Sequence, residues 1–120
     1  MVGDLLTGEQ LPDWFQYPRE FQAIIDRNLV DLAPWSILFG DQLRERSAGL
    51  KQRYLNRSLV PFARRLDNDD VACWERGGGN TVIIIHDFAS PGFEDRQRYD
   101  SLWDWFRAAV DDMIEYEDGP

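Results

Sequence analysis

The residues that could carry out catalysis are few, because the 120-residue chain has one cysteine and one histidine. Any Cys–His or Ser–His–Asp scheme would have to use His86 as its base. If residues 77–80 form a hairpin loop, Cys73 and His86 are diagonal neighbours on one sheet face. Their Cβ atoms then lie about 7–8 Å apart, too far for a direct hydrogen bond. A loop one residue shorter places them on opposite faces. Since free cysteines are mostly buried and unreactive, we predict no catalytic residue.

The other candidate motifs also favour structural interpretations. His86 and Asp87 are neighbours in a predicted strand, so their side chains point to opposite faces instead of forming a dyad. The segment 67–70 is acidic but lacks the Gly and the distant Glu of a calcium-binding EF-hand loop. Three glycines, 77–79, precede a strand, whereas a phosphate-binding loop precedes a helix. We therefore expect two turns, and neither a cofactor nor a metal.

A set of acidic residues is the strongest candidate for a binding surface. Its members are Asp67, Asp69, Asp70, Asp87, Glu94 and Asp95. The first three lie in one turn, and the others follow the longest apolar strand. In a meander, the turn after the first strand and the end of the third strand lie at the same end of the sheet. We expect one negative rim that contributes to partner association and specificity, with an ordinary solvated edge as the alternative.

The overall charge limits the classes of partner. Lys and Arg number 13 and Asp and Glu number 22, giving a formal net charge of −9. Nucleic acids and anionic membranes require clustered basic residues, so we exclude both as partners. A basic protein partner is compatible with this charge, because an acidic surface would steer its approach. The alternative is that the charge only aids solubility.

Three apolar runs near the middle of the chain predict a three-stranded antiparallel meander. They are Leu59–Ala63, Val71–Trp74 and Val82–Ile85, separated by an Asp-rich and a Gly-rich turn. Pro61 predicts that the first strand is an edge strand or begins there, since proline cannot donate to the ladder. Residues 82–85 have no polar face, which predicts a central strand covered on both sides. Residues 93–98 are polar and predict a surface loop.

Helical periodicity flanks this meander. Pro18–Asn28 predicts a helix with Phe21, Ile24, Ile25 and Leu29 on one face. Residues 40–55 favour one helix interrupted at Gly49, or two short ones. A closing helix, capped by Asp100 or Ser101, should pack on the sheet. Its predicted apolar face comprises Tyr99, Leu102, Trp103, Phe106, Ala109, Val110, Met113 and Ile114.

These patterns predict one α+β domain spanning residues 1–120, with an antiparallel sheet flanked by N-terminal and C-terminal helices. We expect residues 1–10 and 115–120 to be loose. The start lacks a signal-peptide pattern and no apolar run is long enough to span a bilayer, so we expect a cytoplasmic protein. The single cysteine allows no internal disulfide.

The sequence LVPFARR, an acidic turn, DVACWE, a Gly-rich turn, a strand and SLWDWF together resemble the SUKH superfamily. That superfamily includes Smi/Knr-like fungal regulators and bacterial immunity proteins. LPDWF is similar to its entry segment and SLWDWFRAAV to its closing helix. The resemblance implies a larger sheet that adds residues 35–38. It also implies a non-enzymatic immunity protein that occludes a basic toxin domain. The alternatives are a regulatory scaffold without a toxin, or a small enzyme using Cys73 and His86 or clustered carboxylates.

Overall fold

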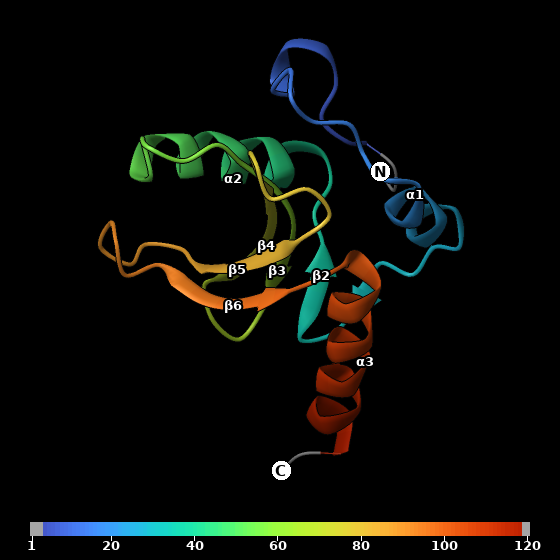
Figure 1. Cartoon of the computed structure of the whole chain (residues 1–120). Helices are drawn as coiled ribbons and strands as arrows, with labels where there is room; N and C mark the ends of the chain where they lie inside the picture. The colour runs from blue at the N-terminus through green and yellow to red at the C-terminus, as the bar shows by residue number, and fades with distance from the viewer. Residues whose placement is uncertain (1–3, 119–120) are drawn as a thin grey trace.

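The computed structural model describes residues 4–118, which form a six-stranded antiparallel sheet with helices on both of its faces (Figure 1). The strands are β1 (Asp31–Leu32), β2 (Trp35–Ile37), β3 (Leu59–Arg65), β4 (Asp70–Glu75), β5 (Val82–His86) and β6 (Asp95–Tyr99). The helices are a 3₁₀ turn η1 (Gly8–Gln10), α1 (Arg19–Asp26), α2 (Gly40–Arg53) and α3 (Leu102–Asp118). Each strand pairs with the next one in sequence, and the predicted α+β class is confirmed.

The predicted meander forms the centre of this sheet as β3, β4 and β5. Residues 82–85 of β5 are all buried, which confirms the prediction of a covered central strand. The prediction of an edge position for β3 is wrong, because β3 lies between β2 and β4. Pro61 is tolerated because the register shifts between Pro61 and Ala63, so that a bulge interrupts the ladder beside it.

The sheet is also larger than the meander. β2 includes most of the segment that the resemblance added, residues 35–38. The predicted polar loop at 93–98 is wrong, since residues 95–99 form β6. β6 is an edge strand whose residues 95–98 are exposed, so it has no apolar alternation to reveal it.

The bulge in β3 decides which residues face each helix layer. Phe62 and Ala63 are consecutive, yet both belong to the core on the side of α1 and α3. Arg64 follows them and pairs with Val71, whose side chain belongs to the core beneath α2. The extra residue therefore turns the arginine toward α2.

Each face of the sheet has its own apolar core. On one side, Trp74 packs against Phe62 with ring centroids 4.3 Å apart and against Phe21 of α1 at 5.3 Å. Trp105 of α3 contacts Phe62 edge-on at 4.9 Å. On the other side, Leu50 and Tyr54 cover the buried residues Leu59, Val71, Cys73, Ile83 and Ile85. The two cores fix α2 on the face opposite α1 and α3.

The face of α3 differs from the predicted one by part of a turn. Trp105, absent from the predicted face, is 1% exposed, whereas Trp103 is 38% exposed. The ring of Trp105 fits between Phe62 and Trp35, which rotates the buried stripe away from Trp103 and Ile114. The predicted cap is confirmed, because the Asp104 N–H donates to the Ser101 hydroxyl at 3.2 Å.

The other helices and the chain ends depart from prediction in small ways. α1 begins one residue after Pro18 and ends at Asp26, which leaves Leu29 exposed. α2 runs through Gly49 without the predicted interruption. Of the ends predicted to be loose, residues 1–3 and 119–120 lie outside the described part. Within the described part, Leu6 is buried and α3 continues to Asp118. The looseness of the ends stays a prediction.

Candidate interaction surface

The structure brings the two acidic segments to the same end of the sheet, as predicted. The Asp87 N–H donates to the Asp69 carbonyl at 2.9 Å. Asp70 pairs with His86 in the β4–β5 ladder, and the His86 Nδ1 lies 2.9 Å from the Asp70 carboxylate. The segments 67–70 and 86–87 are therefore adjacent.

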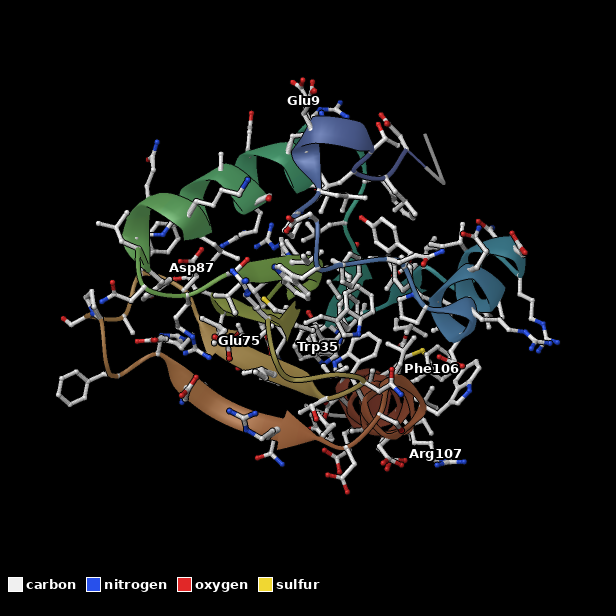
Figure 2. The ribbon with its side chains drawn as sticks, turned by 45° about the horizontal axis from the view of Figure 1, so that its top comes forward. Glu9, Trp35, Glu75, Asp87, Phe106 and Arg107 are labelled. Carbon is white, nitrogen blue, oxygen red and sulfur yellow. The ribbon has the colours of Figure 1, made fainter. Side chains whose placement is uncertain are left out.

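Asp87, however, is not part of an exposed rim. Its side chain is fully buried beneath α2 (Figure 2). Arg53 donates to it through Nε and Nη2, both at 2.7 Å, and Arg46 donates through Nη1 at 2.7 Å. The Phe88 N–H adds a fourth bond at 2.8 Å. Burial alone raises the pKa of the Asp87 carboxyl, but these donors outweigh it and hold the pKa below its ordinary value.

Glu94 is likewise a buried structural residue. The Arg57 guanidinium donates to Glu94 at 2.8 Å, to Asp95 at 2.7 Å and to Glu75 at 2.6 and 2.7 Å. The Gly92 N–H donates to the second Glu94 oxygen at 2.6 Å. Burial raises the pKa of Glu94, but the hydrogen bonds from Arg57 and the backbone have the larger combined effect. The pKa of Glu94 is therefore below its ordinary value. Hydrogen bonds to Glu75, Asp95 and Glu94 raise the pKa of Arg57.

Three of the six predicted acidic residues remain exposed to a partner. Asp95 is 61% exposed at its side chain, although it bonds to Arg57. Asp69 is exposed, and Asp67 is exposed beside Arg65, whose hydrogen bond lowers the Asp67 pKa. For these three residues the rim stays a prediction. Asp70 is only 16% exposed at its side chain and is bonded to His86. Asp87 and Glu94 do not belong to an exposed rim, because arginines from outside the meander pair with their buried carboxylates.

Two adjoining loops at this end expose apolar side chains that the sequence analysis did not select. We define the loop pair as residues 54–58, between α2 and β3, and residues 87–94, between β5 and β6. Leu55 is 83% exposed, Phe93 81% and Phe88 62%. Figure 1 shows the second loop extending beside the C-terminal end of α2. Phe88 and Phe93 flank the turn at 90–92 and follow no helical or strand period, which is a sequence signal against a core position.

Contacts between the loops hold them together. The Tyr54 hydroxyl donates to the Ala89 carbonyl at 2.8 Å, and the Arg57–Glu94 bond spans the same two segments. The Arg53 guanidinium lies 4.1 Å from the centre of the Phe88 ring. Phe88 has φ of +68°, an unusual value for a non-glycine residue. The loop pair thus presents its apolar side chains from a fixed backbone.

The geometry does not assemble the proposed Cys–His pair. Cys73 pairs with Ile83, which corresponds to the shorter loop and places its side chain on the face opposite that of His86. Cys73 is fully buried, and burial raises the pKa of its thiol. His86 is bonded to Asp70 at a strand end. Among residues 4–118, no three His, Cys, Asp or Glu side chains are grouped to hold a metal ion.

Comparison with known proteins provides no relative for this chain: no family model, curated protein or solved structure matches it. Within the described part of the chain, no helix has the length and apolar character needed to cross a membrane.

Proposed function

We propose that this chain is a non-enzymatic interaction domain that binds one basic protein through the loop pair. The observation that carries the proposal is the exposure of Leu55, Phe88 and Phe93 on loops tied down by buried ion pairs. The described residues expose eight large apolar side chains, and the loop pair carries three of them. Adjoining loops that expose several large apolar side chains are therefore a candidate protein-binding site.

Rigidity makes these side chains suitable anchors. A large part of the cost of association is the ordering of loops and side chains at the interface. Here Asp87 and Glu94 fix the loop 87–94 from both ends before any partner arrives. In most interfaces a few anchor residues supply most of the binding energy.

Charge selects the class of partner. Asp95 lies at the base of the loop pair, and Asp67 and Asp69 lie at the same end of the sheet. Together with the net charge of −9, they favour the approach of a positively charged surface. A basic protein is the class of partner that best matches exposed apolar side chains beside these three carboxylates.

We further propose that the partner is a toxin domain, which the chain neutralises by occluding its working surface. The support is the SUKH resemblance of the segments around β3, β4 and α3. A regulatory scaffold uses the same surface, and the two differ in outcome: a neutraliser abolishes its partner's activity at a one-to-one ratio.

Capture from a lysate of the source cells tests the proposal when matched variants are used as baits. The wild type should retain one stoichiometric basic protein that moderate salt releases. Leu55→Ser combined with Phe93→Ser should lose it. Ile114→Ser combined with Tyr116→Ser removes two exposed apolar residues of α3 and should retain it. Equal retention by all three baits would exclude the loop pair as the binding site.

A further inference from the structure

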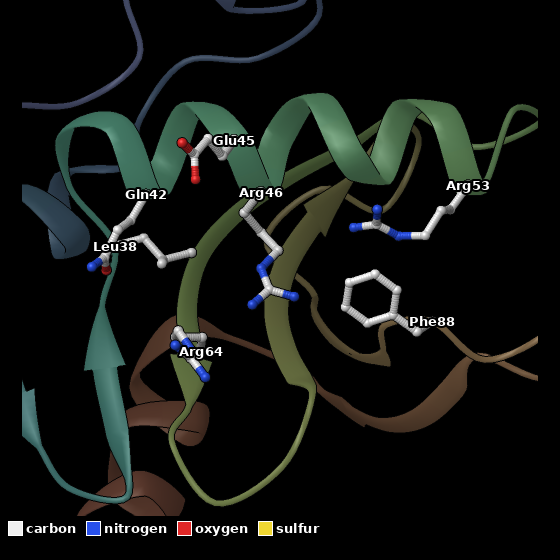
Figure 3. A pocket seen from close by; sticks show the side chains of 7 residues that line it. All are labelled: Leu38, Gln42, Glu45, Arg46, Arg53, Arg64 and Phe88. Atoms are coloured by element: carbon white, nitrogen blue, oxygen red, sulfur yellow. The ribbon is translucent and has the colours of Figure 1, made fainter.

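A pocket of about 330 Å³ lies between α2 and the sheet, next to the loop pair (Figure 3). Its lining includes Arg46, Arg53, Arg64 and Phe88. Arg46 and Arg53 reach into it from α2, and Arg64 lies below them on β3 (Figure 3). In a chain with nine more acidic than basic charges, three arginines around one pocket are a marked local reversal of sign.

We propose that this pocket binds a small oxyanion, the phosphate or carboxylate group of a small molecule. The charges around it do not cancel. Three guanidinium groups face two carboxylates, those of Asp87 and Glu45, which leaves one positive charge in excess. An anion in the pocket would balance it.

Arg64 is the residue that most needs such a ligand. Its Nε is buried and has no hydrogen-bond partner among the described residues. No carboxylate of residues 4–118 forms an ion pair with it, whereas Arg46, Arg53, Arg57 and Arg65 all have one. Leaving a partly buried guanidinium without a counter-charge is costly, and oxyanions with two oxygens match its donors in pairs.

Asp87 orients the other two arginines without using all their donors. It accepts from Nη1 of Arg46 and from Nε and Nη2 of Arg53. Within residues 4–118, Nε and Nη2 of Arg46 and Nη1 of Arg53 form no hydrogen bond. The buried carboxylate therefore pre-positions two arginine side chains, and their remaining N–H groups are available to a ligand.

The rest of the lining limits the size and charge of the ligand. Leu38 forms an apolar wall, and Phe88 is a partly exposed ring at the pocket. Glu45 also lines the pocket, which disfavours ligands of high negative charge. The acidic remainder of the chain repels extended polyanions such as nucleic acids. A free mono- or dianion is the class that fits.

Titration of the full chain with inorganic phosphate and with succinate, each followed by amide NMR, tests the proposal. Sodium chloride at matched ionic strength is the reference. Phosphate, succinate or both should shift the amides around Arg46, Arg64 and Phe88 in a saturable manner that chloride does not reproduce. The stronger of the two ligands identifies the phosphoryl or carboxylate class. Shifts confined to other parts of the chain, or identical to those with chloride, would overturn the proposal.

Variants separate specific binding from general charge effects. Arg64→Gln should weaken the better anion at least about tenfold, and Arg64→Lys should bind between Arg64→Gln and wild type because it keeps only the charge. Arg27→Gln removes an exposed arginine just beyond α1 and should bind as the wild type does. Unchanged affinity in a folded Arg64→Gln protein would contradict the assignment, and the wild-type shift map decides the matter if that variant does not fold.

Discussion

Asp87 ties the loop between β5 and β6 to α2. Four donors converge on its carboxylate, and removing the charge leaves Arg46 and Arg53 facing each other without a counter-ion. We expect Asp87→Asn to lower the free energy of unfolding by about 3–5 kcal/mol at pH 7. Urea denaturation measures this. Asp111→Asn, at an exposed position of α3, should change it by less than about 0.5 kcal/mol.

The same carboxylate makes stability depend on pH. The folded-state pKa values of Asp87 and Glu94 lie below their ordinary values. Their stabilisation is therefore complete above pKa values of about 4 in the unfolded chain, and it is lost as pH falls through the lower folded-state values. Wild-type stability should fall below about pH 4, and Asp87→Asn should show a shallower decrease. Parallel curves for the two proteins would contradict this account of Asp87.

Phe88 combines an exposed ring with a strained backbone. A φ of +68° is disfavoured for any residue with a Cβ, and glycine accepts it freely. Phe88→Gly should therefore be more stable than Phe88→Ala by about 1 kcal/mol in thermal or urea unfolding, although both lose the ring over Arg53. If alanine were the more stable replacement, the backbone strain at this loop would not be real.

At the scale of elements, α2 contains Gly49 in its interior, although glycine has a low helix propensity. A Cβ at Gly49 would lie 2.5 Å from Nη2 of Arg53, the guanidinium that holds Asp87. We expect Gly49→Ala to destabilise the wild type although alanine is the better helix former by about 1 kcal/mol. In an Arg53→Met background the same change should stabilise. A double-mutant cycle measures this, and simple additivity would contradict the interpretation of Gly49.

The two tryptophans of α3 provide a second test at this scale. Trp105→Ala should cost about 3–5 kcal/mol, because its ring is buried between Trp35 and Phe62. Trp103→Ala should cost far less, since that ring is partly exposed. Thermal unfolding of the two variants compares them directly, and a larger loss for Trp103 would restore the face expected from periodicity alone.

Elements with strong local patterns could be predicted from the sequence, and the others could not. The all-apolar composition of residues 82–85 predicts a buried strand, and Ser101 at the start of an apolar helical pattern predicts the cap of α3. β6 has no such pattern, because the polar sequence of an exposed edge strand cannot be distinguished from that of a surface loop. The helical period predicts that α3 has a buried face but not which residue lies at the centre of that face. The space between Trp35 and Phe62, which Trp105 fills, determines the centre.

At the scale of the whole molecule, chain topology predicted that the two acidic segments meet, and the structure confirms this. Their burial could not be predicted, because it depends on Arg46, Arg53 and Arg57, which lie far earlier in the sequence. Similarly, the bulge after Pro61 turns Arg64 toward α2, and no local pattern specifies its direction. Ion pairs with arginines distant in sequence thus determine which carboxylates are structural and which remain available to a partner.

The most direct test of the central claim is calorimetric titration of the purified captured protein with three forms of this chain. We predict one-to-one binding by the wild type, with loss of the partner's activity at the same ratio. Leu55→Ser combined with Phe93→Ser should weaken binding by at least about a hundredfold, as expected for two anchor residues. Ile114→Ser combined with Tyr116→Ser should leave it unchanged. Unaltered affinity of the Leu55/Phe93 variant would contradict the claim that the loop pair is the binding surface.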